Sequence, residues 1–152
     1  MTRSNARELA VHLIYAHEFN DDEPRAIFSN LLAIEYYKRL SEEVPLYEDR
    51  PSAAQQAYIE RVLTGVISRV DELNELIGKY AIGWDVSRIS KLTRSILQLA
   101  FFEMQFVDDV PTGVAISEAV RMAKLYDGDD TGSFVNGILG AFARAMTSEV
   151  SE

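Results

Sequence analysis

The sequence has 152 residues, which suffices for one ordinary domain or two small lobes. Its hydrophobic content of 47% and charged content of 26% are those of a globular protein and exclude a disordered chain. The absence of cysteine excludes disulfides and sulfur-based zinc sites. The net charge of −9 argues against a broadly basic surface for nucleic acid but permits a local basic patch.

The first predicted helix runs to about Phe19. Asn5 and Glu8 have the spacing of a capping box, and apolar residues follow at intervals of three and four. Glu8 also stands where a signal peptide would have its apolar segment. No apolar run approaches the roughly 20 residues that span a bilayer. We therefore expect a cytoplasmic protein with no membrane partner.

A second helix is predicted to begin at Pro24, which suits a first helical turn, and to fade near Glu42. Residues 43–51 contain two prolines and four charged residues, so we expect them to form the main loop. The acidic residues of the chain are concentrated near the end of the first helix and in this loop. One end of the protein is therefore expected to be acidic.

The most regular apolar pattern follows this loop. Ser52 and Gln55 have the spacing of a second capping box, and apolar residues then recur for five turns, from residue 59 to 77. This pattern predicts one long helix. Gly65 lies within it and marks a place for a bend, and Gly78 and Gly83 are expected to close the segment.

A short turn of helix is predicted at 84–89, and three more helices are predicted after it. They cover 91–106, a segment opened by Pro111 and Thr112, and a segment entered through Asp130. No segment alternates with period two over a useful length. We therefore predict an all-α fold of about seven helices in two small bundles that share a core.

The predicted bundles are an N-terminal lobe of about residues 1–50 and a C-terminal bundle of about 51–152. The proline-containing loop would separate them.

No pattern predicts a metal, a cofactor or a catalytic centre. Asp127–Gly132 matches the first six positions of a calcium loop, but the twelfth position holds Ile138 instead of the closing glutamate. His12 and His17 are five residues apart, so their rings diverge by roughly 140° on a helix. The chain also lacks a nucleophile elbow, a Walker loop and a dinucleotide fingerprint. We expect a protein that is not an enzyme.

Basic and aromatic residues give a weak indication of RNA binding. Arg3 and Arg7 are four residues apart and lie one above the other on the first helix. Tyr15 is about 80° round that helix from Arg7, and Phe134 lies at the edge of an apolar stripe, where partial exposure would let it stack on a base. Two other interpretations remain open: core packing for the aromatic residues, and simple solvation for the arginines.

Longer motifs support a more specific hypothesis. P-T-G-V-A-I-S-E-A-V-R-M-A-K-L-Y at 111–126, followed by S-F-V-N-G-I-L at 133–139, resembles the C-terminal signature of the NusB family of transcription antitermination factors. A-R-E-L-A-V-H-L-I-Y at 6–15 is similar to the family's first helix. W-D-V-S-R-I at 84–89 and I-L-Q-L-A-F-F-E-M at 96–104 are similar to its inter-helix turn and the helix that follows.

The resemblance implies an all-helical protein that binds the boxA segment of ribosomal RNA leaders together with NusE, a small-subunit ribosomal protein. It also implies assembly into an antitermination complex on RNA polymerase. The family's RNA contacts map onto Arg3, Arg7, Tyr15, Lys124, Asp130 and Phe134. The expected NusE surface includes Trp84, Arg88, Lys91 and Arg94. Arginine and lysine would bind phosphates, aromatic residues would stack on bases, and the carboxylate would read base edges.

The same resemblance implies that RNA affinity depends on the partner. Better-studied members carry a run of arginines at the N-terminus, whereas this chain has only Arg3 and Arg7 there. With a net charge of −9, we expect the heterodimer with NusE to do most of the binding. We expect Lys124, Asp130 and Phe134 to face the first-helix residues across a groove that holds single-stranded RNA.

Two other classes of function are considered. Similar helical domains occur fused to ribosomal RNA cytosine methyltransferases, but this sequence contains no Rossmann-like segment for a methyl donor. The other class is a protein-interaction module, such as a homodimer whose RNA groove is covered or lost.

Overall fold

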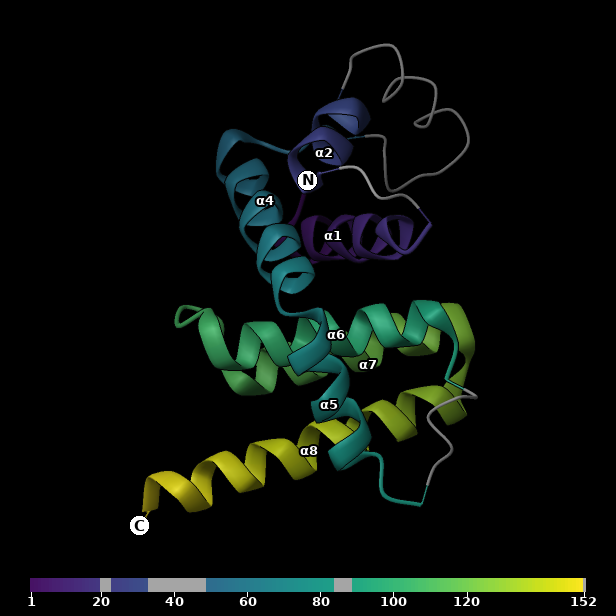
Figure 1. Ribbon diagram of the computed structural model, residues 1–152, viewed down its shortest axis with the longest axis vertical. Coiled ribbons are helices and arrows are strands. Elements are labelled where there is room, and N and C mark those ends of the chain that lie inside the picture. Colours follow the sequence, from purple (N-terminus) through teal and green to yellow (C-terminus); the bar gives the residue numbers. More distant parts are fainter. Residues whose placement is uncertain (20–22, 33–48, 84–88, 152) are drawn as a thin grey trace. The chain divides into compact units, whose positions relative to one another are not determined.

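The computed structural model describes residues 1–19, 23–32, 49–83 and 89–151 (Figure 1). These residues form seven α-helices and no strand, which confirms the all-α prediction. The helices are α1 (Arg3–His17), α2 (Pro24–Leu32), α4 (Ala53–Ser68), α5 (Val70–Tyr80), α6 (Lys91–Phe106), α7 (Thr112–Asp127) and α8 (Asp129–Ser151). None of the helices in these ranges is long and apolar enough to cross a membrane.

The chain divides into two compact units, Met1–Ser68 and Arg69–Glu152. The division falls between α4 and α5, not near residue 50 as predicted from the proline-containing loop. The start of α4 therefore belongs with the N-terminal helices. The reason is packing: α4 contacts both α1 and α2, so its apolar face completes the first unit.

The long helix predicted across residues 52–77 is two helices, α4 and α5. Arg69 lies between them with φ −119° and ψ 19°, away from helical values near −63° and −42°. The bend is therefore at Arg69 and not at Gly65, which lies inside α4. The helix continues past Gly78 and ends at Tyr80, between the two glycines expected to close the segment, and Gly83 follows with φ +81°. A one-residue break leaves the spacing of apolar residues almost unchanged, which explains why the pattern did not predict it.

The first unit has one apolar core to which all three of its described helices contribute. The buried residues include Leu9, Ala10, Leu13 and Ile14 from α1, Ile27, Phe28 and Leu31 from α2, and Ile59, Val62, Leu63 and Val66 from α4. They recur at three and four residues, so each helix presents one stripe to the others.

The two predicted helix starts in this unit have different outcomes. The capping box of α4 is confirmed, because Gln55 N–H donates to Ser52 Oγ at 3.2 Å and Ser52 N–H donates to Gln55 Oε1 at 2.9 Å. The cap predicted at Asn5 is wrong. Thr2 caps α1 instead, and its Oγ1 accepts from Asn5 N–H at 3.0 Å. Gln55 Nε2 also donates to the carbonyl of Met1, which holds the N-terminus at the start of α4.

The second unit is built around α6, which contacts α5, α7 and α8. Three aromatic rings form the centre of its core. Phe101 and Phe142 meet edge to face with centroids 4.9 Å apart, and Tyr80 meets Phe142 in the same way at 5.4 Å. Edge-to-face pairs add about 0.5–1.5 kcal/mol beyond the area they bury. These rings join the end of α5 to the middle of α6 and α8.

Asp127, the last residue of α7, ties the end of that helix to the beginning of α6. Its carboxylate accepts hydrogen bonds from Ser90 Oγ at 2.9 Å and from Thr93 Oγ1. Ser90 is also the N-cap of α6, and its Oγ accepts the N–H of Thr93 at 3.0 Å. A carboxylate at a helix N-terminus is further favoured by the helix dipole. These bonds hold the C-terminus of α7 in place.

We predict that Thr93→Val lowers the free energy of unfolding by about 1–2 kcal/mol, because it removes one donor to a charged acceptor while keeping the side chain's shape. Thr147→Val is the matched control: its exposed hydroxyl donates to Ala143 O in its own helix. That variant is expected to change the free energy by less than about 0.5 kcal/mol. Equal urea denaturation midpoints for the two variants would contradict the role of the Asp127 cluster.

Candidate nucleic-acid interface

A single residue joins α7 to α8. Gly128 has φ +94°, a conformation that favours glycine, and its N–H donates to the carbonyl of Lys124 at 3.2 Å. The next residue, Asp129, already begins α8. α7 and α8 form the most extensive helix pair in the part of the chain that the structure describes. The junction therefore fixes the first turn of α8 against the last turn of α7.

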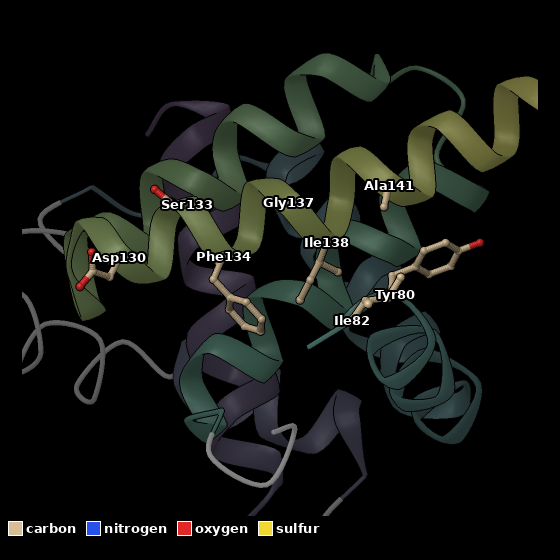
Figure 2. A pocket seen from close by; sticks show the side chains of 8 residues that line it. All are labelled: Tyr80, Ile82, Asp130, Ser133, Phe134, Gly137, Ile138 and Ala141. Carbon is tan, nitrogen blue, oxygen red and sulfur yellow. The ribbon is translucent and has the colours of Figure 1, made fainter. Parts of the chain in front are cut away.

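A pocket of about 580 Å³ opens beside the first half of α8, within the second unit (Figure 2). The α8 residues that line this pocket recur at intervals of three and four and so share one side of the helix: Asp130, Ser133, Phe134, Gly137, Ile138 and Ala141. Tyr80 and Ile82, at and after the end of α5, complete the wall. Figure 2 shows Asp130 at the beginning of α8, with Phe134 and Ile138 projecting from one side of the helix. A mainly apolar cavity with a carboxylate at one end suits a planar ring that carries N–H groups on its edge.

Phe134 is more buried than the sequence predicted. We expected it at the edge of the apolar stripe and partly exposed, but only 9% of its surface is accessible. The stripe of α8 is wide enough to include it beside Val135 and Ile138. Its ring therefore helps to form the core, and only its pocket-facing part is open to a ligand.

Arg3 and Arg7 lie over the same ring in the first unit. The guanidinium carbon of Arg3 is 3.8 Å from the centroid of the Tyr58 ring, and that of Arg7 is 5.9 Å from it. The two arginines are therefore neighbours, as their spacing predicts. They differ in exposure, because Arg3 is exposed whereas Arg7 is only 3% accessible. Arg3 can meet a phosphate directly, while Arg7 is better placed to support the ring and its neighbour.

Tyr15 lies near the end of α1 and is 37% exposed, which excludes the interpretation that it is plain core. Its ring meets that of Phe19 edge to face, with centroids 5.2 Å apart. Phe19 is 61% exposed and was not identified from the sequence, although its spacing of four residues from Tyr15 gave the signal. Together the two residues present an exposed aromatic pair.

Lys124 is exposed in the last turn of α7. Its aliphatic chain lies against α8 at Gly132. Gly132 is about 200° round α8 from Asp130, so Lys124 approaches the helix from the side away from the pocket. The structure therefore brings Asp130 and Phe134 together in the pocket and Arg3 and Arg7 together at Tyr58. The groove predicted to unite all six residues stays a prediction.

Of the four residues predicted to bind a protein partner, Trp84 and Arg88 lie outside the described residues. Lys91 and Arg94 are in the first turn of α6, where Lys91 is exposed and Arg94 is partly buried. Their role stays a prediction.

The described residues contain no group of three or more histidine, cysteine, aspartate or glutamate residues that could hold a metal ion. His12 is largely buried, and burial lowers its pKa below the ordinary value of 6.5. The imidazole is therefore uncharged at neutral pH, and the positive charge of α1 near its start comes from its arginines.

The pocket and the exposed arginine and aromatic side chains of this all-helical chain are suited to binding RNA or another protein. The NusB family model matches residues 4–144. A transcription antitermination protein NusB of Acetivibrio thermocellus is 41% identical over 140 residues, covering 92% of this chain and 87% of the relative. That of Agathobacter rectalis is 35% identical over 146 residues, covering 94% and 100%.

Solved structures agree with these sequence relationships. NusB of T. maritima is 28% identical, with a TM-score of 0.75 over 95% of this chain and 92% of that one. A chain from a complex of antitermination factors NusB and NusE with double-stranded RNA shares the fold, with a TM-score of 0.73 at 21% identity over 94% of this chain and 96% of that one. The chain belongs to the NusB family.

We predict that the same substitution at two phenylalanines has different effects on the free energy of unfolding. Phe134→Leu is expected to lower the free energy of unfolding by about 1 kcal/mol or more, because a buried ring is lost from the core. Phe19→Leu is the control, and it should change the value by less than about 0.5 kcal/mol because that ring is exposed. Guanidinium titrations of both variants test this. A Phe134→Leu variant as stable as the parent would show that the ring is not part of the core.

Proposed function

We propose that this protein is a non-catalytic, cytoplasmic transcription antitermination factor that binds boxA-type single-stranded RNA together with NusE. In this proposal the pair joins an antitermination complex on RNA polymerase. Membership of the NusB family supports the general role. The observation that supports an RNA-binding site is that Asp130 and Phe134 line the same pocket.

In the proposed mechanism, an unpaired base enters this pocket. The exposed carboxylate of Asp130 accepts hydrogen bonds from N–H groups on the base edge, while Phe134 and Ile138 supply apolar contact. The low accessibility of Phe134 favours contact with part of the ring over full stacking. The pocket would then select a base by shape and by its donor pattern.

Phosphates and a second base would be bound by residues of α1 and α7. Arg3 and Lys124 are exposed cations suited to phosphate, and Tyr15 with Phe19 offers an exposed aromatic surface on which a base can stack. Stacking of this kind contributes about 1–3 kcal/mol per base.

The charge of the protein explains why a partner is needed. A chain with net charge −9 repels RNA at long range, because its 24 acidic residues outnumber its 15 lysines and arginines. A basic ribosomal protein is attracted by the same charge and adds its own contacts to the RNA. The heterodimer therefore binds RNA more tightly than the acidic chain alone.

We predict that the protein binds boxA RNA much more tightly when NusE is present, because NusE supplies cationic surface that this chain lacks. Fluorescence anisotropy of a labelled boxA RNA, titrated with the protein alone and with an equimolar NusE mixture, measures this. NusE alone and a scrambled RNA are the reference titrations. Equally weak binding with and without NusE would contradict the proposal and favour a protein-interaction module.

Two matched arginine variants test, in the same assay, whether the RNA contacts α1. Arg3→Met should weaken binding and lower the slope of log affinity against log salt by about 0.7, the value for one phosphate on a single strand. Arg25→Met removes the same charge from an exposed arginine that pairs with Glu60 at 2.6 Å. It should leave the slope unchanged.

A further inference from the structure

Gly132 of α8 is covered by the side chain of Lys124. A Cβ added at Gly132 would lie 2.5 Å from Cγ of Lys124, 3.0 Å from its Cε and 3.2 Å from its Cδ. Real Cβ atoms essentially never approach another heavy atom as closely as the first of these distances. The lysine stem therefore occupies the space that any other residue at position 132 would need.

The backbone does not explain this glycine. Among the glycines described, positive φ values occur only at Gly83 and Gly128, so residue 132 has a conformation that alanine could adopt. Glycine is also a poor residue inside a helix. At Gly78, Gly113 and Gly137 an added Cβ would meet nothing within 4 Å. Gly132 thus differs from these three helical glycines because the side chain of Lys124 covers it.

The contact at Cγ determines the χ1 rotamer of Lys124 and therefore the direction of its whole side chain. The position of Cγ depends on χ1 alone, so the overlap with an added Cβ is relieved only by rotating χ1 or moving the helix. In a helix χ1 has essentially two available rotamers. A change from one to the other swings the stem through about 120° and carries the ammonium several ångströms away.

The ammonium at the end of this stem is available to a ligand. Lys124 is exposed, and among the residues that the structure describes no carboxylate forms an ion pair with it. An α-helix with its side chains is only about 10–12 Å across, so a strand that crosses the first turns of α8 can reach both Lys124 and the Asp130 side.

We propose that Gly132 is a positioning residue for RNA binding, because its missing side chain lets the stem of Lys124 lie flat on α8 and directs the ammonium to a phosphate. The inference rests on the proposed RNA-binding function. It adds a residue that touches no RNA itself and acts only through the rotamer of Lys124. A stem that is held before binding also loses less rotamer entropy when the phosphate arrives.

The first arm of the test needs no RNA. Three-bond couplings measured by NMR give χ1 of Lys124 in the parent, in Gly132→Ala and in Gly78→Ala, whose exposed site on α5 is the matched control. We expect the parent and Gly78→Ala to share one χ1 rotamer and Gly132→Ala to populate another. An unchanged Lys124 rotamer in Gly132→Ala would overturn the inference, whatever the protein binds.

The second arm is a double-mutant cycle with boxA RNA in the presence of NusE. Lys124→Met, which keeps the length of the stem, should lower the salt slope of RNA affinity by about 0.7. Gly132→Ala should cause a similar loss, and adding it to Lys124→Met should cause no further loss. A purely structural effect of residue 132 would instead persist in the Lys124→Met background.

The outcomes separate this inference from the proposed function. If Lys124→Met weakens binding but Gly132→Ala does not, despite a changed rotamer, Gly132 has no positioning role. If neither variant affects a boxA complex that still forms, Lys124 lies outside the RNA site, which overturns the inference while the proposed function stands. If the parent with NusE does not bind boxA RNA, the proposed function itself fails.

Discussion

The close packing of α7 against α8 is the constraint on which the second-unit site depends. One glycine with φ +94° joins the two helices, so their ends have almost no freedom to separate. Asp127 holds the end of α7 to the beginning of α6, and Lys124 lies directly on Gly132 of α8. The position of Asp130 and Phe134 on the first turns of α8 is therefore set by three local contacts. A ligand meets a site whose backbone is already ordered.

The first unit presents a different kind of surface. Arg3 and Arg7 lie over one aromatic ring, that of Tyr58, and of these two arginines Arg3 is exposed whereas Arg7 is buried. Guanidinium groups stack well on aromatic faces, which fixes the charge in place but limits the number of phosphates it can reach. A protein with a net charge of −9 is suited to conditional binding, in which a basic partner determines whether RNA is bound.

The helices were predictable from the sequence because each carries a stripe of period 3.6, and Ser52 with Gln55 identified one helix start correctly. The break at Arg69 was not predictable, since a one-residue interruption leaves that period intact. At the N-terminus the capping-box spacing selected Asn5, whereas the cap is Thr2, which has no glutamate or glutamine three residues later. The exposure of individual side chains was harder to predict. A side chain at the edge of an apolar stripe is buried only if the surface packed against the helix is wide enough to cover it. Phe134, which is buried, and Tyr15, which is exposed, show the two outcomes.

The central claim is that RNA bound with NusE contacts the beginning of α8 and the exposed residues of α1. Amide chemical shifts of ¹⁵N-labelled protein, recorded with unlabelled NusE before and after adding boxA RNA, test it most directly. The account predicts that RNA-dependent shifts concentrate at Asp130, Ser133 and Phe134 and at Arg3 and Tyr15. Shifts confined to other helices, with these five residues unchanged, would contradict it.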